Sequence, residues 1–456
     1  MKLFVFDDKK NIYTHILDKN NIESKTLLLP TGTTPLGLYN EIIKRKIDFS
    51  NIITFNLDEY YKIEKDNCDS YHYYMFNNLF KHTNILPENI HLLDGNTDNI
   101  VDECIKYSNL IKEYPIDIAF LGIGINGHIA FNEPGCDINS TTRLIDLTDE
   151  TKNVNQIKYN KALSVGISEI LSSKKIIILA TGKTKTNIIY DLINCIEPKN
   201  DLPASYLINH SNVDLYIDND AFSNVLHYLS PTFMNYNKIL IFSPHPDDDV
   251  IGMGASIKKF IECGKDVTIV YQTSGSNGGN TLIRQEESIN ALKILGLHNK
   301  TKIIFGDTPF YNNKKIIVNN EDDVKYTLNI IKNINPDVIF FAGDTCDPHK
   351  THLICNEIIQ KCLKHLSSVK SSIDAYNYYS AWYSPPSNEY THKEYFNKDL
   401  MDLKIESIKA HVTQLNPLFS GDLNIDFYSV VEKRNKSNSQ QEFCDIYLEG
   451  FTLFIY

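Results

Sequence analysis

The stretch from Ile116 to Gly135, IDIAFLGIGINGHIAFNEPG, decides how the first half of the chain folds. Its opening run, IDIAFL, is mostly apolar and is typical of a strand buried in a parallel sheet. A glycine-rich turn follows and presents Asn126, His128 and Glu133 close together. A lone histidine is usually structural, whereas a histidine between an amide and a carboxylate at a strand exit indicates an acid–base cluster.

Short apolar runs of this kind recur along the chain and alternate with amphipathic stretches such as Leu36–Ile43 and Arg284–Leu295. The predicted strands are Thr26–Leu29, Ile52–Phe55, Ile116–Leu121, Ile176–Leu179, Val213–Ile217, Ile239–Phe242, Val267–Tyr271, Lys302–Phe305 and Val338–Phe341. Alternation of strands and helices predicts the α/β class, with mostly parallel sheets flanked by helices.

A change in composition separates the two halves of the chain. Residues 222–237 are rich in asparagine, contain a Ser-Pro pair and are followed by a fresh strand pattern, KILIFS. We therefore predict two consecutive domains, at residues 1–225 and 238–456, each with its own sheet. Both are of an ordinary size for an α/β domain.

Composition excludes several classes of protein. The 456 residues are 42% hydrophobic and 22% charged, so the chain can bury cores and is not broadly disordered. A net charge of −12 argues against a nucleic-acid partner. The sequence shows no signal-peptide pattern, no apolar run near the ~20 residues that span a bilayer, and no CxxC pair. We expect a cytoplasmic protein with no nucleic-acid or membrane partner.

The loop after the first predicted strand has the features of an anion site. Gly32 permits a tight turn, and Thr33 and Thr34 lead into the helical pattern. Thr34 is predicted to be the N-cap, and Pro35 suits the first helical position. Free N–H groups at a helix N-terminus favour a negatively charged ligand, although an ordinary strand–turn–helix gives the same pattern.

Two later strand exits also carry charged residues. Asp58 and Glu59 follow Ile52–Phe55, at the end of a strand where open α/β sheets bind ligands. The pair suits a general base with an orienting partner, or, alternatively, a capped helix start with solvated acids. After Ile176–Leu179, Lys183 and Lys185 are either phosphate contacts or surface charges.

Six segments of the first half match one family in order. They are PTGTTPLGLY, FNLDEYY, SYHYYMFNN, GINGHIAFNEPG, ALSVGISEIL and DLPASYL. Residues 27 to about 220 therefore resemble the glucosamine-6-phosphate deaminases, which belong to the same superfamily as the 6-phosphogluconolactonases. This resemblance implies a phosphosugar substrate converted to fructose 6-phosphate and ammonia, no cofactor for this half, and a homo-oligomer.

The resemblance also implies roles for individual residues. Asp58 takes the C2 proton, His128 opens the pyranose ring, Glu133 supports ring opening and Asn126 holds the imidazole. Substrate-binding roles fall on Gly32, Thr33, Thr34 and Lys185.

One segment departs from the family pattern. The stretch TKNVNQIKYN lacks the arginine that the family uses to bind phosphate, and Lys158 is the nearest substitute. The alternative is therefore a phosphosugar-binding sensor without turnover.

The second half carries a separate polar cluster. After Ile239–Phe242, the segment SPHPDDD crowds His245 against three aspartates, which repel one another unless a cation lies among them. After Val338–Phe341, the segment DPHKTH carries His349 and His352 at the start of a helical pattern. Two imidazoles and one carboxylate suit a catalytic zinc site with an open position for water.

Residues 238–455 resemble the PIG-L/LmbE zinc-dependent N-deacetylases, which act on N-acetylglucosamine-type sugars. The segments that carry this resemblance are HPDDD, RQEESINALKILG, HKTH, KAHVTQ and YLEGF. It implies a Zn²⁺ held by His245, Asp248 and His352.

Two further roles follow from the same resemblance. Asp247 is the base that activates the zinc water, and His349 steadies the oxyanion or protonates the leaving amine. Asp249 replaces a glutamate of the family pattern, and Thr351 replaces an acid that orients the base. The alternative is an interaction module with a vestigial metal site.

Overall fold

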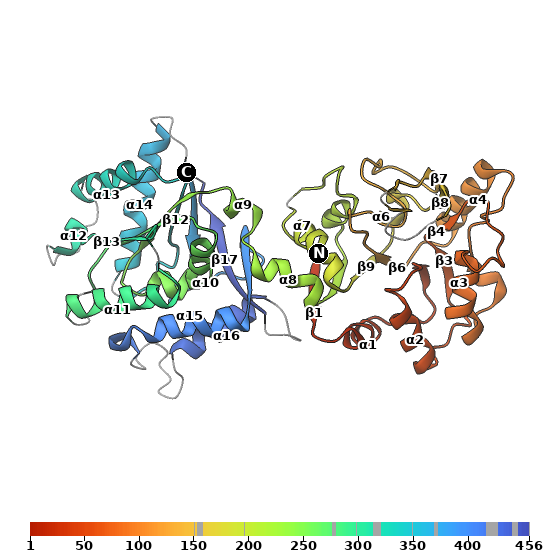
Figure 1. Cartoon of the computed structure of the whole chain (residues 1–456), viewed down its shortest axis with the longest axis horizontal. Helices are drawn as coiled ribbons and strands as arrows, with labels where there is room; N and C mark the ends of the chain where they lie inside the picture. Colours follow the sequence, from red (N-terminus) through yellow and green to blue (C-terminus); the bar gives the residue numbers. More distant parts are fainter. Residues whose placement is uncertain are drawn as a thin grey trace. The chain divides into compact units, whose positions relative to one another are not determined.

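The computed structural model describes the whole chain except residues 150, 153–157, 196, 276–279, 298, 313–320, 349, 369–372, 416–426, 440–445 and 456. The chain divides into two compact units, Met1–Asn224 and Val225–Tyr456. Each unit has its own seven-stranded sheet with helices packed around it (Figure 1). Among the described helices, none combines the length and the apolar character needed to cross a bilayer.

All strands of the first unit's large sheet are parallel. In spatial order they are β1 (Lys2–Phe6), β10 (Val213–Asp218), β9 (Lys175–Ala180), β6 (Ile118–Gly122), β2 (Thr26–Leu29), β3 (Ile53–Asn56) and β5 (Ile90–His91). The helices are α1 (Lys9–Lys19), α2 (Leu36–Arg45), α3 (Tyr71–Asn78), α4 (Ile100–Glu113), α6 (Ile167–Leu171), α7 (Thr186–Ile193) and α8 (Asn219–His227). Short 3-10 helices are η1 (Phe80–His82), η2 (Pro87–Asn89), η3 (Lys183–Lys185) and η4 (Pro203–Asn209).

The direction of winding reverses between β2 and β6. From β2 the chain proceeds to β3 and β5 on one side, and from β6 it proceeds to β9 and β10 on the other. In open parallel sheets, ligands bind at the carboxyl ends of the strands beside such a reversal. The loops that leave β2 and β6 are therefore the expected place for a ligand.

A small antiparallel sheet lies beside this edge. It contains β4 (Asp58–Tyr60), β8 (Lys161–Ser164) and β7 (Arg143–Asp146), with Asp58 opposite Ser164. The chain leaves the large sheet after Asn56 and pairs again at once with β8. Asp58 is thus held by a second sheet, which the sequence did not predict.

The second unit has a mixed sheet. Its strands, in spatial order, are β13 (Lys302–Phe305), β12 (Asp266–Tyr271), β11 (Lys238–Ser243), β14 (Val338–Ala342), β15 (Asp374–Tyr378), β17 (Ile446–Leu453) and β16 (His392–Asn397). Pairing is parallel from β13 to β15 and antiparallel at β17 and β16.

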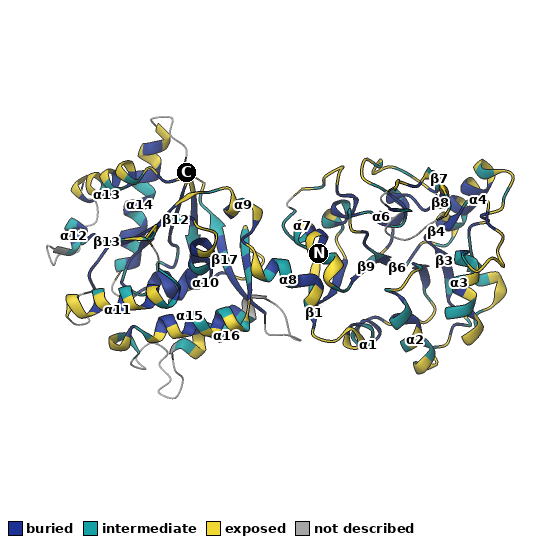
Figure 2. Cartoon of the chain, viewed as in Figure 1, coloured by how far each residue is buried: buried dark blue, intermediate teal, exposed yellow. Residues whose placement is uncertain are grey.

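The helices of this unit surround the mixed sheet. They are α9 (Pro231–Met234), α10 (Asp248–Glu262), α11 (Thr281–Ile294), α12 (Pro309–Asn312), α13 (Glu321–Ile334), α14 (Thr351–Ser368), α15 (Lys398–Lys409), α16 (Phe427–Ser439) and the 3-10 helix η6 (Val412–Gln414). Figure 2 shows α11 and α15 with buried and exposed residues alternating along each helix, as amphipathic helices do.

The predicted α/β class is confirmed, and every predicted strand overlaps an observed one. The prediction for Thr34 is wrong by one position, because α2 begins at Leu36 with Pro35 at the N-cap and no side-chain cap. The strands β1, β4, β5, β7 and β8 of the first unit were missed. So were β15, β16 and β17 of the second unit. Polar residues interrupt their apolar ones, as in HKEYFN, so no continuous apolar run marks them.

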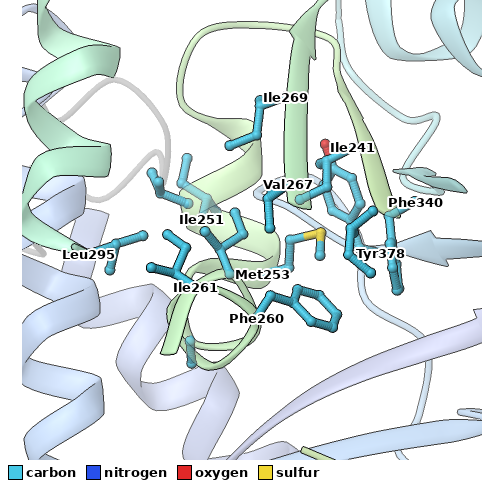
Figure 3. Close-up of a cluster of buried hydrophobic side chains, with 14 of the residues drawn as sticks. Ile241, Ile251, Met253, Phe260, Ile261, Val267, Ile269, Leu295, Phe340 and Tyr378 are labelled. Atoms are coloured by element: carbon cyan, nitrogen blue, oxygen red, sulfur yellow. The ribbon is translucent and has the colours of Figure 1, made fainter. Parts of the chain in front are cut away.

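Apolar side chains from β11, β12 and α10 form one core of the second unit (Figure 3). Ile241, Val267, Met253 and Phe260 are all fully buried there. Full burial of such a side chain stabilises the fold by about 1.5–3 kcal/mol relative to exposure. The packing fixes α10, whose first residue is Asp248.

A buried ion pair holds a kink in α10. Met253 leaves the helical region, with φ −143° and ψ 29°. Glu449 accepts hydrogen bonds from the N–H groups of Ala255 (2.9 Å) and Ser256 (2.8 Å), and pairs with the buried Lys404 at 2.6 Å. The carboxylate therefore satisfies donors that the kink would otherwise leave unpaired.

Candidate functional site

The residues predicted to act in the first half follow four neighbouring strands of one sheet. In spatial order these strands are β9, β6, β2 and β3. Lys185 follows β9, the cluster of Asn126, His128 and Glu133 follows β6, the loop with Gly32, Thr33 and Thr34 follows β2, and Asp58 follows β3. Because parallel strands end at the same edge, the topology brings these segments to one edge of the sheet.

Asp58 is a buried carboxylate with little to stabilise its charge. Its exposed fraction is 7%. Burial, with a smaller contribution from the charge of Glu59, raises the pKa of Asp58 to about 8, and no hydrogen bond contributes to that value. A carboxylate with a pKa near neutral pH is a suitable general base.

Glu59 has a different role from its neighbour. Its carboxylate accepts hydrogen bonds from Ser70 Oγ (2.7 Å) and from the N–H groups of Tyr71 (3.0 Å) and His72 (2.9 Å). It therefore holds the first turn of α3. Burial raises the pKa of Glu59, and the hydrogen bonds lower it by less. The predicted helix cap therefore fits Glu59, but the prediction of solvated acids is wrong, because Asp58 and Glu59 are both buried.

Glu133 is a stabilised anion beside His128. Its carboxylate accepts hydrogen bonds from Asn126 Nδ2 (2.9 Å) and Thr151 Oγ1 (2.5 Å), and lies 3.7 Å from His128 Nδ1. Burial raises the pKa of Glu133, but the interactions with His128, Thr151 and Asn126 outweigh it and lower the value to about 2. Glu133 is thus ionised at any physiological pH.

The glycine-rich turn fits closely around the imidazole of His128. A Cβ atom at Gly124 would overlap that ring, and Gly127 has φ +83°. Asn126 Oδ1 accepts the backbone N–H of His128 at 3.2 Å. Among the described contacts, Asn126 binds Glu133 and the backbone of His128, and none joins its amide to the imidazole as the resemblance implied.

Two of the three candidate phosphate lysines, Lys185 and Lys158, lie in different surroundings, and the third, Lys183, is exposed. Lys185 Nζ donates to the carbonyl of Ile123 at 2.7 Å, directly after β6, and burial lowers its pKa. Lys158 has an 81% exposed side chain and lies 3.6 Å from Asp69. Of Lys185 and Lys158, Lys185 is the one that contacts a strand exit carrying the other residues.

Three side chains of the second unit converge on one point. The donor atoms of His245, Asp248 and His352 all lie within 4.8 Å of one another. Asp248 Oδ2 is 3.1 Å from both His245 Nδ1 and His352 Nε2, and the two nitrogens are 3.2 Å apart. Tetrahedral zinc with bonds of about 2.0–2.2 Å places its ligands about 3.4 Å apart. The donor set therefore suits a zinc ion.

Surrounding groups fix these three donors. His352 Nδ1 lies 3.3 Å from Asp344 Oδ1, which orients the ring so that Nε2 faces the other donors. The hydroxyl of Ser380 lies 2.7 Å from Asp344 Oδ2 and 2.8 Å from Asp248 Oδ1. Ser380 and Asp344 are fully buried.

Asp247 lies next to the donor set without joining it. Its Oδ2 accepts a hydrogen bond from the buried Arg284 at 3.1 Å. Asp249, by contrast, is bound by the Tyr271 hydroxyl at 3.0 Å, and burial raises its pKa to about 7. His349 lies outside the described residues.

Several residues of these sites were not found in the sequence. They are Thr151, Arg284, Asp344, Ser380 and the buried His411, which interacts electrostatically with Asp247 and Arg284 and whose ring nitrogens have no hydrogen-bond partner among the described residues. Asp344 follows a predicted strand directly, so its position could have revealed it. The others depend on contacts between distant segments.

Comparison with known proteins covers both halves of the chain. The family described as glucosamine-6-phosphate isomerases/6-phosphogluconolactonase matches residues 10–217, and the PIG-L family, described as GlcNAc-PI de-N-acetylase, matches residues 240–363.

Individual relatives match the first half. A glucosamine-6-phosphate deaminase of Clostridium acetobutylicum is 46% identical over 212 residues, which are 44% of this chain and 87% of the relative. One of Clostridium novyi is 41% identical over 246 residues, which are 49% of this chain and 100% of the relative. A solved structure of a monomeric glucosamine-6-phosphate deaminase is 35% identical, with TM-score 0.47, and covers 49% of this chain and 99% of its own.

Replacement of Asp58 by asparagine should stabilise the protein increasingly as pH rises. Between the ordinary carboxyl pKa of about 4 and the native value of about 8, native Asp58 keeps a proton that the unfolded chain releases. Wild type therefore loses stability relative to Asp58→Asn across that window. Thermal unfolding at about pH 5 and pH 8 measures the difference. An equal difference in Tm at both pH values would show that burial does not perturb Asp58.

Proposed function

Because the chain belongs to the glucosamine-6-phosphate deaminase family through its N-terminal half and carries a PIG-L domain in its C-terminal half, we propose a bifunctional enzyme. Residues 1–225 form the deaminase domain, which converts glucosamine 6-phosphate to fructose 6-phosphate and ammonia. Residues 238–456 form a zinc-dependent deacetylase domain, which removes acetate from N-acetylglucosamine 6-phosphate or a related N-acetyl sugar. The second domain then supplies the substrate of the first.

Ring opening is the first step in the deaminase domain. His128 moves a proton from the C1 hydroxyl to the ring oxygen, so that the sugar opens to its aldehyde. The anionic Glu133, 3.7 Å from His128 Nδ1, stabilises the protonated imidazole that forms in between. Asn126 and Thr151 hold that carboxylate in place.

Isomerisation and loss of ammonia follow. Asp58 takes the C2 proton and returns it to C1, while one proton moves from the amine to O1, which leaves a hydroxyl at C1 and an imine at C2. Water adds to that carbon, and the nitrogen leaves as ammonia. The observation that carries this proposal is the buried Asp58, with a pKa of about 8, held at the same sheet edge as His128.

The loop after β2 and Lys185 bind the phosphate in this proposal. Gly32 and Thr33 are exposed residues, and their N–H groups would donate to the anion. Lys185 adds a positive charge beside the exit of β6. Without the family's arginine, a sensor that binds phosphosugar but does not turn it over is the second candidate.

In the deacetylase domain, His245, Asp248 and His352 would hold the Zn²⁺, and Asp344 orients His352. A zinc ion bound there supplies a Lewis acid and lowers the pKa of a bound water. Asp247 accepts the proton of the attacking water, and Arg284 fixes its carboxylate. His349 protonates the leaving amine or steadies the oxyanion.

We also propose a cytoplasmic homo-oligomer whose partner is the small phosphosugar, with no nucleic-acid or membrane partner. The support is the family resemblance and the net charge of −12, which disfavours binding to nucleic acid.

Acetate and ammonia measured together should separate the two activities. Wild type incubated with N-acetylglucosamine 6-phosphate should release both products. Asp58→Ala should release acetate but at least about 100-fold less ammonia, because the base is lost. His352→Ala should release no acetate, yet still release ammonia from glucosamine 6-phosphate. If wild type binds glucosamine 6-phosphate without releasing ammonia, the sensor is the correct function.

Zinc content should depend on the three converging donors. Purified wild type should hold one zinc ion per chain, and His245→Ala and His352→Ala should hold almost none. His365→Ala is the matched control, because His365 is exposed on the same helix, α14, as His352. Elemental analysis and chelator-induced loss of thermal stability measure the effect. Zinc-free wild type would instead favour a vestigial interaction module.

A further inference from the structure

Three tyrosine hydroxyls hold carbonyl groups of the loop that follows β2. The pairs and their oxygen–oxygen distances are Tyr39 with Pro30 at 2.5 Å, Tyr74 with Gly32 at 2.5 Å, and Tyr13 with Thr34 at 2.9 Å. The tyrosines come from α2, α3 and α1, respectively. Burial raises the pKa of each hydroxyl, so each keeps its proton and acts as a donor.

These bonds determine how the loop faces a ligand. A carbonyl oxygen carries partial negative charge and repels an anion, whereas an N–H group attracts one. A carbonyl that is bonded to an external hydroxyl cannot turn toward an anion held by the loop's N–H groups. Gly32 also has φ +92°, a conformation that favours glycine, and its surroundings leave open space.

Tyr74 differs from the other two tyrosines because its helix, α3, is also bonded to the strand that carries Asp58. Glu59 holds the first turn of α3 by accepting the N–H groups of Tyr71 and His72. Glu59 directly follows Asp58 in β4. The helix α3 therefore connects the strand that carries the proposed base to the loop proposed for the phosphate.

We propose that Tyr74 is a positioning residue of the deaminase site. By fixing the Gly32 carbonyl, it keeps the N–H groups of residues 31–34 directed at the phosphate group of the substrate. Through α3 and Glu59 it also sets the distance between that phosphate and Asp58. The inference rests on the proposed function, because it concerns the loop assigned there to the sugar phosphate.

The test compares Tyr74→Phe with wild type and with Tyr73→Phe. Tyr73 is the matched control, because it is the preceding residue of α3 and is 41% exposed. With Tyr74→Phe, KM for glucosamine 6-phosphate should rise roughly threefold to tenfold, the range of one lost hydrogen bond, with a smaller change in kcat. The inhibition constant of inorganic phosphate should rise by the same factor, and Tyr73→Phe should match wild type in both.

Hydrogen exchange gives a readout that does not need turnover. The amide of Tyr39, which donates to the Pro35 carbonyl at the end of this loop, should exchange faster in Tyr74→Phe than in wild type or Tyr73→Phe. A lower Tm alone, with KM, phosphate affinity and loop exchange unchanged, would overturn the inference.

Failure of the proposed function gives a different result. If wild type releases no ammonia, calorimetry with inorganic phosphate decides the inference. Weaker phosphate binding by Tyr74→Phe than by Tyr73→Phe would support it. Equal affinity, or no phosphate binding by wild type, would overturn it.

Discussion

Parallel pairing of neighbouring strands is the constraint on which both sites depend. Parallel strands end at the same edge of a sheet. Strand pairing alone therefore brings residues that are far apart in the sequence to that edge. In the first unit, β9, β6, β2 and β3 deliver the candidate residues to that edge. In the second, the neighbours β11, β14 and β15 are followed by His245, Asp344 and Ser380, respectively. The chain thus uses one arrangement twice, for different chemistry.

Within that arrangement, hydrogen bonding decides which carboxylates are reactive. Asp58 and Glu133 are both buried from water to a large extent, yet their pKa values differ widely, at about 8 and about 2. Glu133 accepts hydrogen bonds from Asn126 and Thr151, while no side-chain donor to Asp58 is found among the described residues, and burial and the charge of Glu59 raise its pKa. The first is therefore a permanent anion, and the second suits the role of a general base. Such a difference between two carboxylates suits an isomerisation that needs both roles.

The sequence reveals the parts of this fold that depend on local pattern. Apolar runs identified most of the parallel strands, and polar residues that follow those runs made Asp58, His128, His245 and His352 candidates. The sequence did not reveal the small sheet of β4, β8 and β7, because the segment DEY of β4 is too short and too polar to be predicted as a strand. Contacts such as that of Tyr74 with Gly32 join segments whose spacing has no periodic signature. Only the assembled fold shows them.

The central claim is that one phosphorylated aminohexose lies between Asp58 and His128. A crystal structure of the protein with glucosamine 6-phosphate tests it most directly. We expect C2 beside the Asp58 carboxylate, the ring oxygen beside His128, and the phosphate against residues 31–34 and Lys185. A bound sugar that contacts only one of those two side chains, or a structure with the two in unconnected pockets, would contradict the claim.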